Sequence, residues 1–247
     1  RNDFENPEFV LFGMDDQEAY NKAKEFYATI HSKPVYKCTI EEAEMIKVTY
    51  NTYITMKICL ANVVMEVAHK LDNVNCDNVM KGLFLADERL MSPKYLLGGM
   101  GDGGGCHPRD NIALSYMAKK LDMRYDWYEN LMICREEQTE WLADLIIEHK
   151  DNLQIMILGK CFKKETNLTV GSPSILLKNL LEERGEDLEM YDPWVDSTEI
   201  NLTKKLYFIG TNHDIFLDYK FPEGSIVLDP WGIIKDREGV KVIRIGR

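Results

Sequence analysis

The chain has 247 residues, which is enough for one large or two ordinary domains. Hydrophobic residues make up 45% and charged residues 29%, and the formal net charge is −11. These numbers are typical of a soluble globular protein, and the acidic balance argues against a non-specific nucleic-acid binder. No run of 18 apolar residues is present to span a membrane, and six cysteines without Cys-x-x-Cys spacing indicate reduced thiols, a cytoplasmic location and no metal site.

The first predicted elements are a strand, a helix and a second strand. Residues 8–12 are predicted as a short strand before a glycine, residues 16–31 as an amphipathic helix, and residues 35–38 as the second strand. A unit of this size is too small to be stable alone, so we expect it to belong to a larger sheet.

A long helix is predicted to follow. Thr39 and Glu42 match a capping box, and no glycine or proline interrupts residues 40–71. Apolar side chains are spread almost all round this helix, which predicts that it is buried in the protein or at a subunit interface. We therefore expect a homodimer built on it.

Two polar residues stand out on that helix. Lys47 and Asn51 are four residues apart and share one face. A buried lysine and an amide could together stabilise an oxyanion. The alternative is a solvated lysine and an incidental asparagine.

The remaining pattern is helical at first and then alternates between strands and helices. Helices are predicted at residues 77–84, 111–121 and 127–150. The later elements are a helix at 173–184 and strands at 153–158, 188–191, 206–209, 226–228 and 240–245. The alternation predicts an α/β layer with a mainly parallel sheet that begins near residues 150–152. Ligands bind beyond the carboxyl ends of such strands, where residues 159–166 carry three lysines.

The most informative stretch is residues 98–105, in which six of eight positions are glycine, followed at once by Cys106. Glycines let the backbone adopt positive φ and approach a ligand closely. Pro108 fits the first turn of a helix, which would place Cys106 at or just before a helix N-terminus. That position favours a thiolate, so the stretch predicts a nucleophile. The alternative is a flexible loop before a small buried cysteine.

Asp110 and His107 are the ionisable neighbours of Cys106. Asp110 lies four residues after the cysteine and could orient a water molecule or accept a proton. It could equally be a carboxylate that is favoured at a helix start. His107 is a poor base for Cys106, because adjacent residues rarely face each other, so a cysteine hydrolase is a weak alternative.

Three stretches occur in an order that resembles a known family. They are residues 42–62, residues 101–110, and residues 158–166 followed by Ser172 and Pro173. The first resembles the central-domain helix of the UDP-glucose/GDP-mannose dehydrogenase family. The second resembles that family's glycine-rich catalytic-cysteine signature, and the third resembles the start of its C-terminal nucleotide-sugar-binding domain.

The resemblance implies an activity. The family oxidises the C6 alcohol of a nucleotide-linked hexose to a carboxylate with two NAD. Cys106 would form a thiohemiacetal and then a thioester, while Lys47 and Asn51 would stabilise oxyanions and position water. Asp110 would assist proton transfer during hydrolysis of the thioester.

The resemblance also implies binding residues. Lys163 and Phe162 would bind the UDP-sugar or GDP-sugar, Arg89 would reach the partner subunit's substrate, and Arg109 would contact NAD. Further residues would line the substrate: Tyr95, Leu96, Gly99 and Gly103.

The implied domains are three. Residues 1–38 would be a remnant of an N-terminal NAD-binding Rossmann domain, residues 39–150 a helical dimerisation domain with the catalytic cysteine, and residues 151–247 a Rossmann-like nucleotide-sugar-binding domain. We expect the chain to be a fragment that is inactive by itself. The sequence departs from the family pattern at five positions, so the preferred sugar and nucleotide base are not determined. These positions are Asp102, Gly105, Leu168, Val170 and Gly232. They also leave open a non-catalytic dimeric nucleotide-sugar-binding protein.

Overall fold

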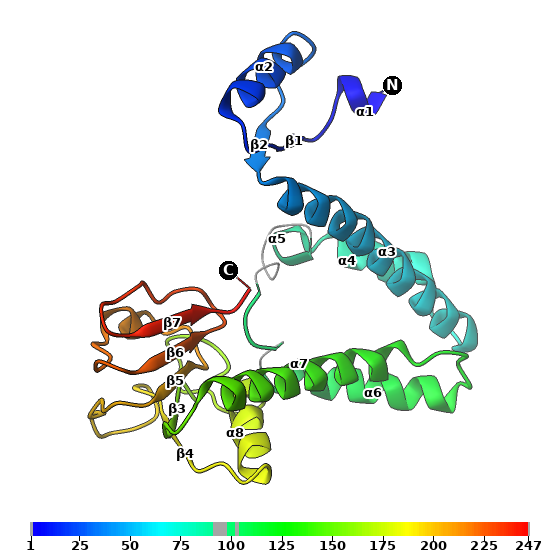
Figure 1. Cartoon of the computed structure of the whole chain (residues 1–247). Coiled ribbons are helices and arrows are strands. Elements are labelled where there is room, and N and C mark those ends of the chain that lie inside the picture. The colour runs from blue at the N-terminus through cyan, green and yellow to red at the C-terminus, as the bar shows by residue number, and fades with distance from the viewer. Residues whose placement is uncertain (1, 91–97, 102–103, 247) are drawn as a thin grey trace. The chain divides into compact units, whose positions relative to one another are not determined.

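The computed structural model describes residues 2–90, 98–101 and 104–246 (Figure 1). Some side chains within the described helices, including that of Asn51, lie outside what the structure describes. Contacts between Cα atoms divide the chain into two compact units, Arg1–Met80 and Lys81–Arg247. Each unit is described by itself, and the domain boundaries at residues 38 and 150 stay predictions.

The first unit begins with the predicted strand–helix–strand arrangement. Its elements are α1 (Asn2–Glu5), β1 (Val10–Gly13), α2 (Gln17–Ala28) and β2 (Val35–Cys38). The strands β1 and β2 are parallel. The side chain of Asp16 caps α2, and the buried ring of Phe12 packs edge-on against the rings of Tyr20 and Tyr27. The three predicted elements are confirmed.

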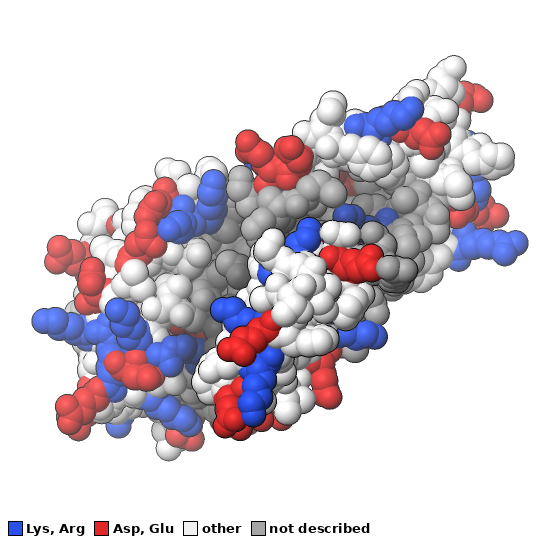
Figure 2. Space-filling view, turned by 90° about the horizontal axis from the view of Figure 1, so that it is seen from above, with Lys and Arg blue, Asp and Glu red and all other residues white. Residues whose placement is uncertain are grey.

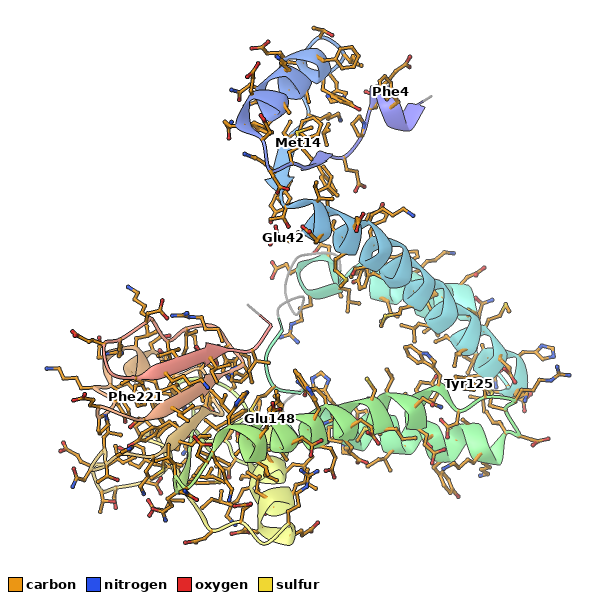
Figure 3. All side chains as sticks on the ribbon, viewed as in Figure 1. Phe4, Met14, Glu42, Tyr125, Glu148 and Phe221 are labelled. Carbon is orange, nitrogen blue, oxygen red and sulfur yellow. The ribbon has the colours of Figure 1, made fainter. Side chains whose placement is uncertain are left out.

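The long helix α3 (Ile40–Lys70) follows, with α4 (Cys76–Phe84) after it. Thr39 and Glu42 form the predicted capping box at its start, where Figure 3 labels Glu42. Within this unit Ala68 is the buried residue among the described side chains of α3, so burial of the helix at a subunit interface stays a prediction. Met45 and Met65 are 65% and 56% exposed. The physical reason is length, since 31 residues extend well past the four-residue strand β1 against which α3 packs.

The second unit opens with helices. These are α5 (Asp87–Leu90), α6 (Cys106–Lys120) and α7 (Trp127–His149). Helices α6 and α7 pack along each other and are joined by a turn that holds Tyr125 (Figure 3). Asp126 at this turn accepts hydrogen bonds from Ser115 Oγ (2.6 Å) and Glu129 N (3.0 Å). Helix α6 starts at Cys106, five residues earlier than the apolar pattern predicted.

A five-stranded sheet forms the rest of the second unit. Its strands are β3 (Ile155–Leu158), β4 (Leu188–Tyr191), β5 (Leu206–Ile209), β6 (Ile226–Asp229) and β7 (Lys241–Arg244). All neighbouring strands are parallel, in the order β4-β3-β5-β6-β7 (Figure 1). Every residue of β3, β5 and β6 is buried. This confirms the predicted α/β fold with a parallel sheet.

The two faces of the sheet are covered differently. Because side chains alternate along a strand, Ile155 and Ile157 face α7 and α8 (Pro173–Glu183), whereas Met156 and Leu158 face the other side. That other side is covered by the 3₁₀ helix η1 (Asp214–Asp218) and by irregular segments, which include Phe221 (Figure 3). Among the described residues, no helix combines the length and the apolar character that crossing a membrane would take.

The strand order creates a topological switch point between β3 and β5. Strand β3 continues through α8 to β4 on one side, while β5 continues through η1 to β6 on the other. The chain therefore leaves the neighbouring carboxyl ends of β3 and β5 in opposite directions, and such switch points are where open parallel sheets bind ligands. The segments at this point are residues 159–166 and 210–213.

Candidate active site

The N-terminus of α6 presents Cys106. Gly105 is the N-cap residue and Cys106 is the first residue of the helix, with Pro108 in the first turn as predicted. Cys106 is exposed, so the alternative of a buried structural cysteine is wrong. The first N–H groups of a helix favour negative charge, and an exposed thiol at this position is accessible to a substrate.

Two charged neighbours accompany this cysteine. Arg109 Nε donates a hydrogen bond to Asp110 Oδ1 at 2.9 Å, and both side chains are largely exposed. This bond raises the pKa of the Arg109 guanidinium above its ordinary value, and the adjacent Cys106 adds to the shift to a smaller extent. The three side chains therefore form one exposed cluster at the start of α6.

The glycine loop before Cys106 is held by three side chains. Gln138 on α7 accepts a hydrogen bond from Gly101 N (3.1 Å) and donates one to Gly99 O (2.9 Å). Met100 lies between these glycines and is buried in the core under α7 and α8. A Cβ atom on Gly99 would lie 2.3 Å from the ring of Trp231, so this close approach needs glycine. Sequence analysis did not single out Gln138 or Trp231.

The same loop contacts the segment that follows β3. Gly104, with φ of +90°, donates a hydrogen bond from its N to Gly171 O at 3.2 Å. A Cβ atom on Gly104 would lie 3.1 Å from the ring of Phe162, and one on Gly171 would lie 2.5 Å from the Gly104 carbonyl carbon. The structure therefore places the predicted binding residue Phe162 against the loop that ends in Cys106.

Three lysines lie on the turn after β3, and they differ in their partners. Lys160 Nζ pairs with Asp196 at 2.6 Å, and Lys164 Nζ pairs with Asp214 at 3.1 Å. Lys163 is exposed, and its ammonium has no ion pair with any residue that the structure describes. Lys163 is thus the lysine of this turn whose charge is available to a ligand.

The buried carboxylate of Asp192, after β4, anchors this turn. Its Oδ2 accepts hydrogen bonds from Lys160 N (2.7 Å), Cys161 N (3.0 Å) and His213 Nε2 (3.1 Å). Its Oδ1 accepts one from Trp194 N at 2.9 Å. Burial alone would raise the pKa of this carboxyl, but these hydrogen bonds outweigh it and hold the pKa well below the usual range.

The same cluster offers a set of donor atoms that suits a metal ion. Ligand atoms of Cys161, Asp192 and His213 lie within 4.8 Å of one another. However, His213 Nδ1 accepts a hydrogen bond from Glu165 N (2.9 Å), so Nε2 carries the proton that is donated to Asp192. Burial raises the pKa of Cys161 to about 12, and its thiol donates to Thr166 O. The lone pairs that a metal needs are therefore used or protonated.

Comparisons with known proteins agree with this geometry. Residues 41–134 match the UDP-glucose/GDP-mannose dehydrogenase family, central domain. The chain is 30% identical to GDP-mannose 6-dehydrogenase of Pseudomonas aeruginosa, over 83% of this chain and 46% of that protein. It is 31% identical to UDP-glucose 6-dehydrogenase of Haloferax volcanii, over 96% of this chain and 60% of that protein.

A solved structure supports the same assignment. The ternary complex of GDP-mannose dehydrogenase from Pseudomonas aeruginosa superposes with a TM-score of 0.87 and 25% identity, over 98% of this chain and 62% of that one. The chain belongs to the UDP-glucose/GDP-mannose dehydrogenase family. It spans about half the length of the curated relatives it matches.

The first unit of this dehydrogenase-family chain carries the other predicted catalytic pair. Lys47 is exposed within its unit, because the neighbours of α3 there do not cover this turn, and its catalytic role stays a prediction. Lys47 lines a cavity of about 480 Å³ together with Glu8, Phe9 and Tyr50. Glu8 lies two residues before β1 and was not singled out from the sequence. The side chain of Asn51 lies outside the described residues, and the approach of this pair to Cys106 stays a prediction.

The remaining predicted residues are distributed as follows. Arg89 is exposed on α5, and Tyr95, Leu96, Asp102 and Gly103 lie outside the described residues. A cavity of about 520 Å³ lies beside the glycine loop, and its lining includes Gly99, His107, Asn111, Arg135, Gln138 and Trp231. This cavity gives the dehydrogenase-family loop space for a ligand on its α7 side.

Surface charge is mixed around these features. Figure 2 shows acidic and basic side chains interspersed over the face it presents, without a continuous basic surface. This distribution agrees with the formal net charge of −11.

Proposed function

We propose that the protein carrying this chain is an NAD-dependent nucleotide-sugar 6-dehydrogenase. It oxidises the C6 alcohol of a UDP-linked or GDP-linked hexose to a carboxylate, with Cys106 as the nucleophile. One observation carries the proposal: exposed Cys106 opens α6, and the turn bearing Phe162 and Lys163 contacts the glycine loop directly before it. A nucleophile and an anion-binding lysine thus belong to one contiguous surface.

The turn after β3 binds the nucleotide sugar in this proposal. The unpaired ammonium of Lys163 attracts the diphosphate, and a charge-assisted hydrogen bond to phosphate is stronger than a neutral one. Phe162 packs its ring against Gly104, which fixes the approach of the ligand to the glycine loop. Backbone groups of Gly99 and its neighbours complete the surface along which the sugar reaches Cys106.

The chemistry at C6 falls to the start of α6. Loss of a hydride and a proton converts the C6 alcohol to an aldehyde. The thiolate of Cys106 attacks the aldehyde carbon and the oxygen takes up a proton, which gives a thiohemiacetal. Loss of a second hydride from that carbon and of the hydroxyl proton leaves a thioester. Water then hydrolyses the thioester to the carboxylate and returns the thiol. Lys47 and Asn51 stabilise the oxyanions, and Asp110 takes a proton from the attacking water.

The cofactor is assigned to NAD, which when bound supplies the hydride acceptor for both oxidations. Among the residues of this chain, Arg109 fits contact with it, because its guanidinium is largely exposed beside Cys106 and carries a positive charge for an anionic group. Residues 1–38 belong in this proposal to the end of an NAD-binding domain, residues 39–150 to the central domain and residues 151–247 to the sugar-nucleotide domain.

We also infer a homodimer that buries α3. Its exposed apolar side chains support this, since Ile40, Met45 and Met65 are 48%, 65% and 56% exposed. Large apolar side chains exposed along one helix are expected to be covered by a partner. Sedimentation of the chain as a monomer at micromolar concentration would contradict the inference.

The test of the activity uses the full-length protein, NAD, and UDP-glucose or GDP-mannose in separate assays. The proposal predicts two NADH formed per sugar oxidised with at least one of them, and loss of this turnover in Cys106→Ser. Unchanged turnover in that variant, or one NADH per sugar, contradicts it.

A dimeric nucleotide-sugar-binding protein without catalysis is the second candidate. One observation favours it: Leu168 and Val170 are 52% and 79% exposed, apolar side chains where the resemblance implies Asp-x-Arg. Val170 also lies next to Gly105, the N-cap of α6. Binding of either nucleotide sugar without any NADH formation supports this candidate over the dehydrogenase.

A further inference from the structure

We propose that Asp192 and His213 are positioning residues that fix the backbone of residues 160–165 and thereby hold Lys163 at the nucleotide-sugar diphosphate. This inference rests on the proposed function, because it gives Lys163 a ligand. Neither residue touches the ligand in this account. Each acts through the turn, from the ends of the strands that follow β3 in the chain.

Asp192 fixes the beginning of the turn. One carboxylate oxygen accepts hydrogen bonds from the consecutive backbone N–H groups of Lys160 and Cys161, at 2.7 and 3.0 Å. Thr211 Oγ1 donates to the Cys161 carbonyl at 2.5 Å. Two donors and one acceptor of adjacent peptide groups are thus held by the ends of β4 and β5, which determines the direction in which the chain leaves β3.

His213 fixes the end of the turn. Its Nδ1 accepts a hydrogen bond from Glu165 N at 2.9 Å, while its Nε2 donates to Asp192. The ring of Trp194 stacks on the imidazole with centroids 4.3 Å apart and an interplanar angle of 11°. Asp192 and His213 are both fully buried, so these bonds are shielded from competing water.

The consequence is a short segment with fixed points at both ends, residues 160 and 161 at one and residue 165 at the other. Within it, Phe162 N donates to Leu168 O at 3.1 Å and the Lys163 carbonyl accepts from Thr166 Oγ1 at 2.9 Å, while the side chain of Lys163 is exposed. Lys163, in the middle, has no ion pair to orient it among the described residues, and its direction depends on the backbone. Holding that backbone in advance reduces the ordering cost of binding a diphosphate.

The experiment measures the dissociation constants of UDP-glucose and GDP-mannose by calorimetry with this chain. We expect Asp192→Asn and His213→Phe each to weaken binding by at least about tenfold. Asn at position 192 offers one oxygen and an NH₂ group to four N–H donors, and Phe at position 213 offers Glu165 N no acceptor. His213→Asn keeps an acceptor near the Nδ1 position, and we expect it to retain most of the affinity.

A double-mutant cycle with Lys163→Ala separates positioning from general destabilisation. If Asp192 and His213 act through Lys163, their substitution in the Lys163→Ala chain changes affinity by less than about twofold. Equal losses in both backgrounds overturn the proposal. Should Asp192→Asn not fold, as judged by circular dichroism, the two His213 variants decide.

Hydrogen exchange separates this proposal from the proposed function. If the unaltered chain binds neither nucleotide sugar, the proposed function fails, and the anchor is judged by the amides of Lys160, Cys161 and Glu165. Exchange at least about tenfold faster at Glu165 in His213→Phe, and not in His213→Asn, supports the anchor. Equal exchange in both variants and the unaltered chain overturns it.

Discussion

The two loops that meet beside Cys106 are held by different kinds of contact. In the glycine loop, Gly101 and Gly104 have φ of +37° and +90°, and their N–H groups donate to the neutral amide of Gln138 and to the Gly171 carbonyl. In the turn after β3, the N–H groups of Lys160 and Cys161 donate instead to a charged group, the buried carboxylate of Asp192. Glycine allows close approach of a substrate to the helix start, whereas the buried carboxylate fixes the place of a charge.

This difference assigns separate tasks to the loops. The glycine loop ends in Cys106, the proposed nucleophile, so changes there should alter the rate of the chemical step. The turn after β3 carries Lys163, so changes there should alter affinity. Each prediction below tests whether rate and affinity separate in this way, from the largest effect to the smallest.

Replacement of the nucleophile should have the largest effect. Cys106→Ser in the full-length protein is expected to lower kcat by about 10³-fold or more, because a hydroxyl is a much weaker nucleophile than a thiolate. The dissociation constant for the nucleotide sugar should change by less than about twofold. Steady-state NADH formation and calorimetry measure the two quantities. A loss of affinity as large as the loss of rate would contradict the assignment of rate to the glycine loop and affinity to the turn after β3.

The lysines of the turn provide a matched pair. Lys163→Ala is expected to weaken nucleotide-sugar binding by about 10- to 100-fold, since it removes an unpaired charge. Lys164→Ala removes a lysine that pairs with Asp214, and a change below about threefold is expected. Calorimetry on the two variants is the measurement. Equal effects would show that net charge matters and that the position of Lys163 does not.

The hydrogen bonds between Gln138 and the glycine loop should influence stability as well as rate. Gln138→Glu replaces the amide N–H₂ that donates to Gly99 O with a carboxylate oxygen that repels it. A loss of about 1–2 kcal/mol in the free energy of unfolding is expected, from one partly buried acceptor left unpaired. Urea unfolding measures it, with exposed Glu137→Gln as the control. Equal stability in both variants would show that Gln138 does not hold the glycine loop.

The buried carboxylate of Asp192 should change how the stability of the protein depends on pH below about pH 5. Its folded-state pKa lies below the unfolded value of about 3.9, so Asp192 stabilises the fold above that pH and the contribution disappears as pH falls below it. The melting temperature of Asp192→Asn should therefore fall less steeply between pH 5 and pH 3 than that of the unaltered chain. Exposed Asp187→Asn is the control and should follow the unaltered chain. Parallel curves for all three proteins would contradict the role of this carboxylate.

Local patterns in the sequence predicted most of the elements. The capping box at Thr39, the apolar runs of β3, β5 and β6, and the proline in the first turn of α6 all act through neighbouring residues. The burial of α3 at a subunit interface stays a prediction, because a helix that is apolar all round does not show which neighbours cover it.

The supporting residues of the site could not be predicted in the same way. Gln138 reaches Gly101 across 37 positions, and Asp192 reaches Lys160 across 32. Such contacts depend on how α7 and the strand ends pack. A single polar residue in a helix or after a strand does not indicate which distant residue it will contact. The helix start at Cys106 and the turn with Phe162 could be singled out because their local sequences are distinctive.

The most direct test of the account is covalent capture at Cys106. The full-length protein is quenched with acid during turnover of the nucleotide sugar that it oxidises, and its peptides are analysed by mass spectrometry. The account predicts a sugar-nucleotide adduct on the peptide that contains Cys106, and its absence from Cys106→Ser. Turnover with an unmodified Cys106 peptide, or an adduct on another cysteine, would contradict the central claim.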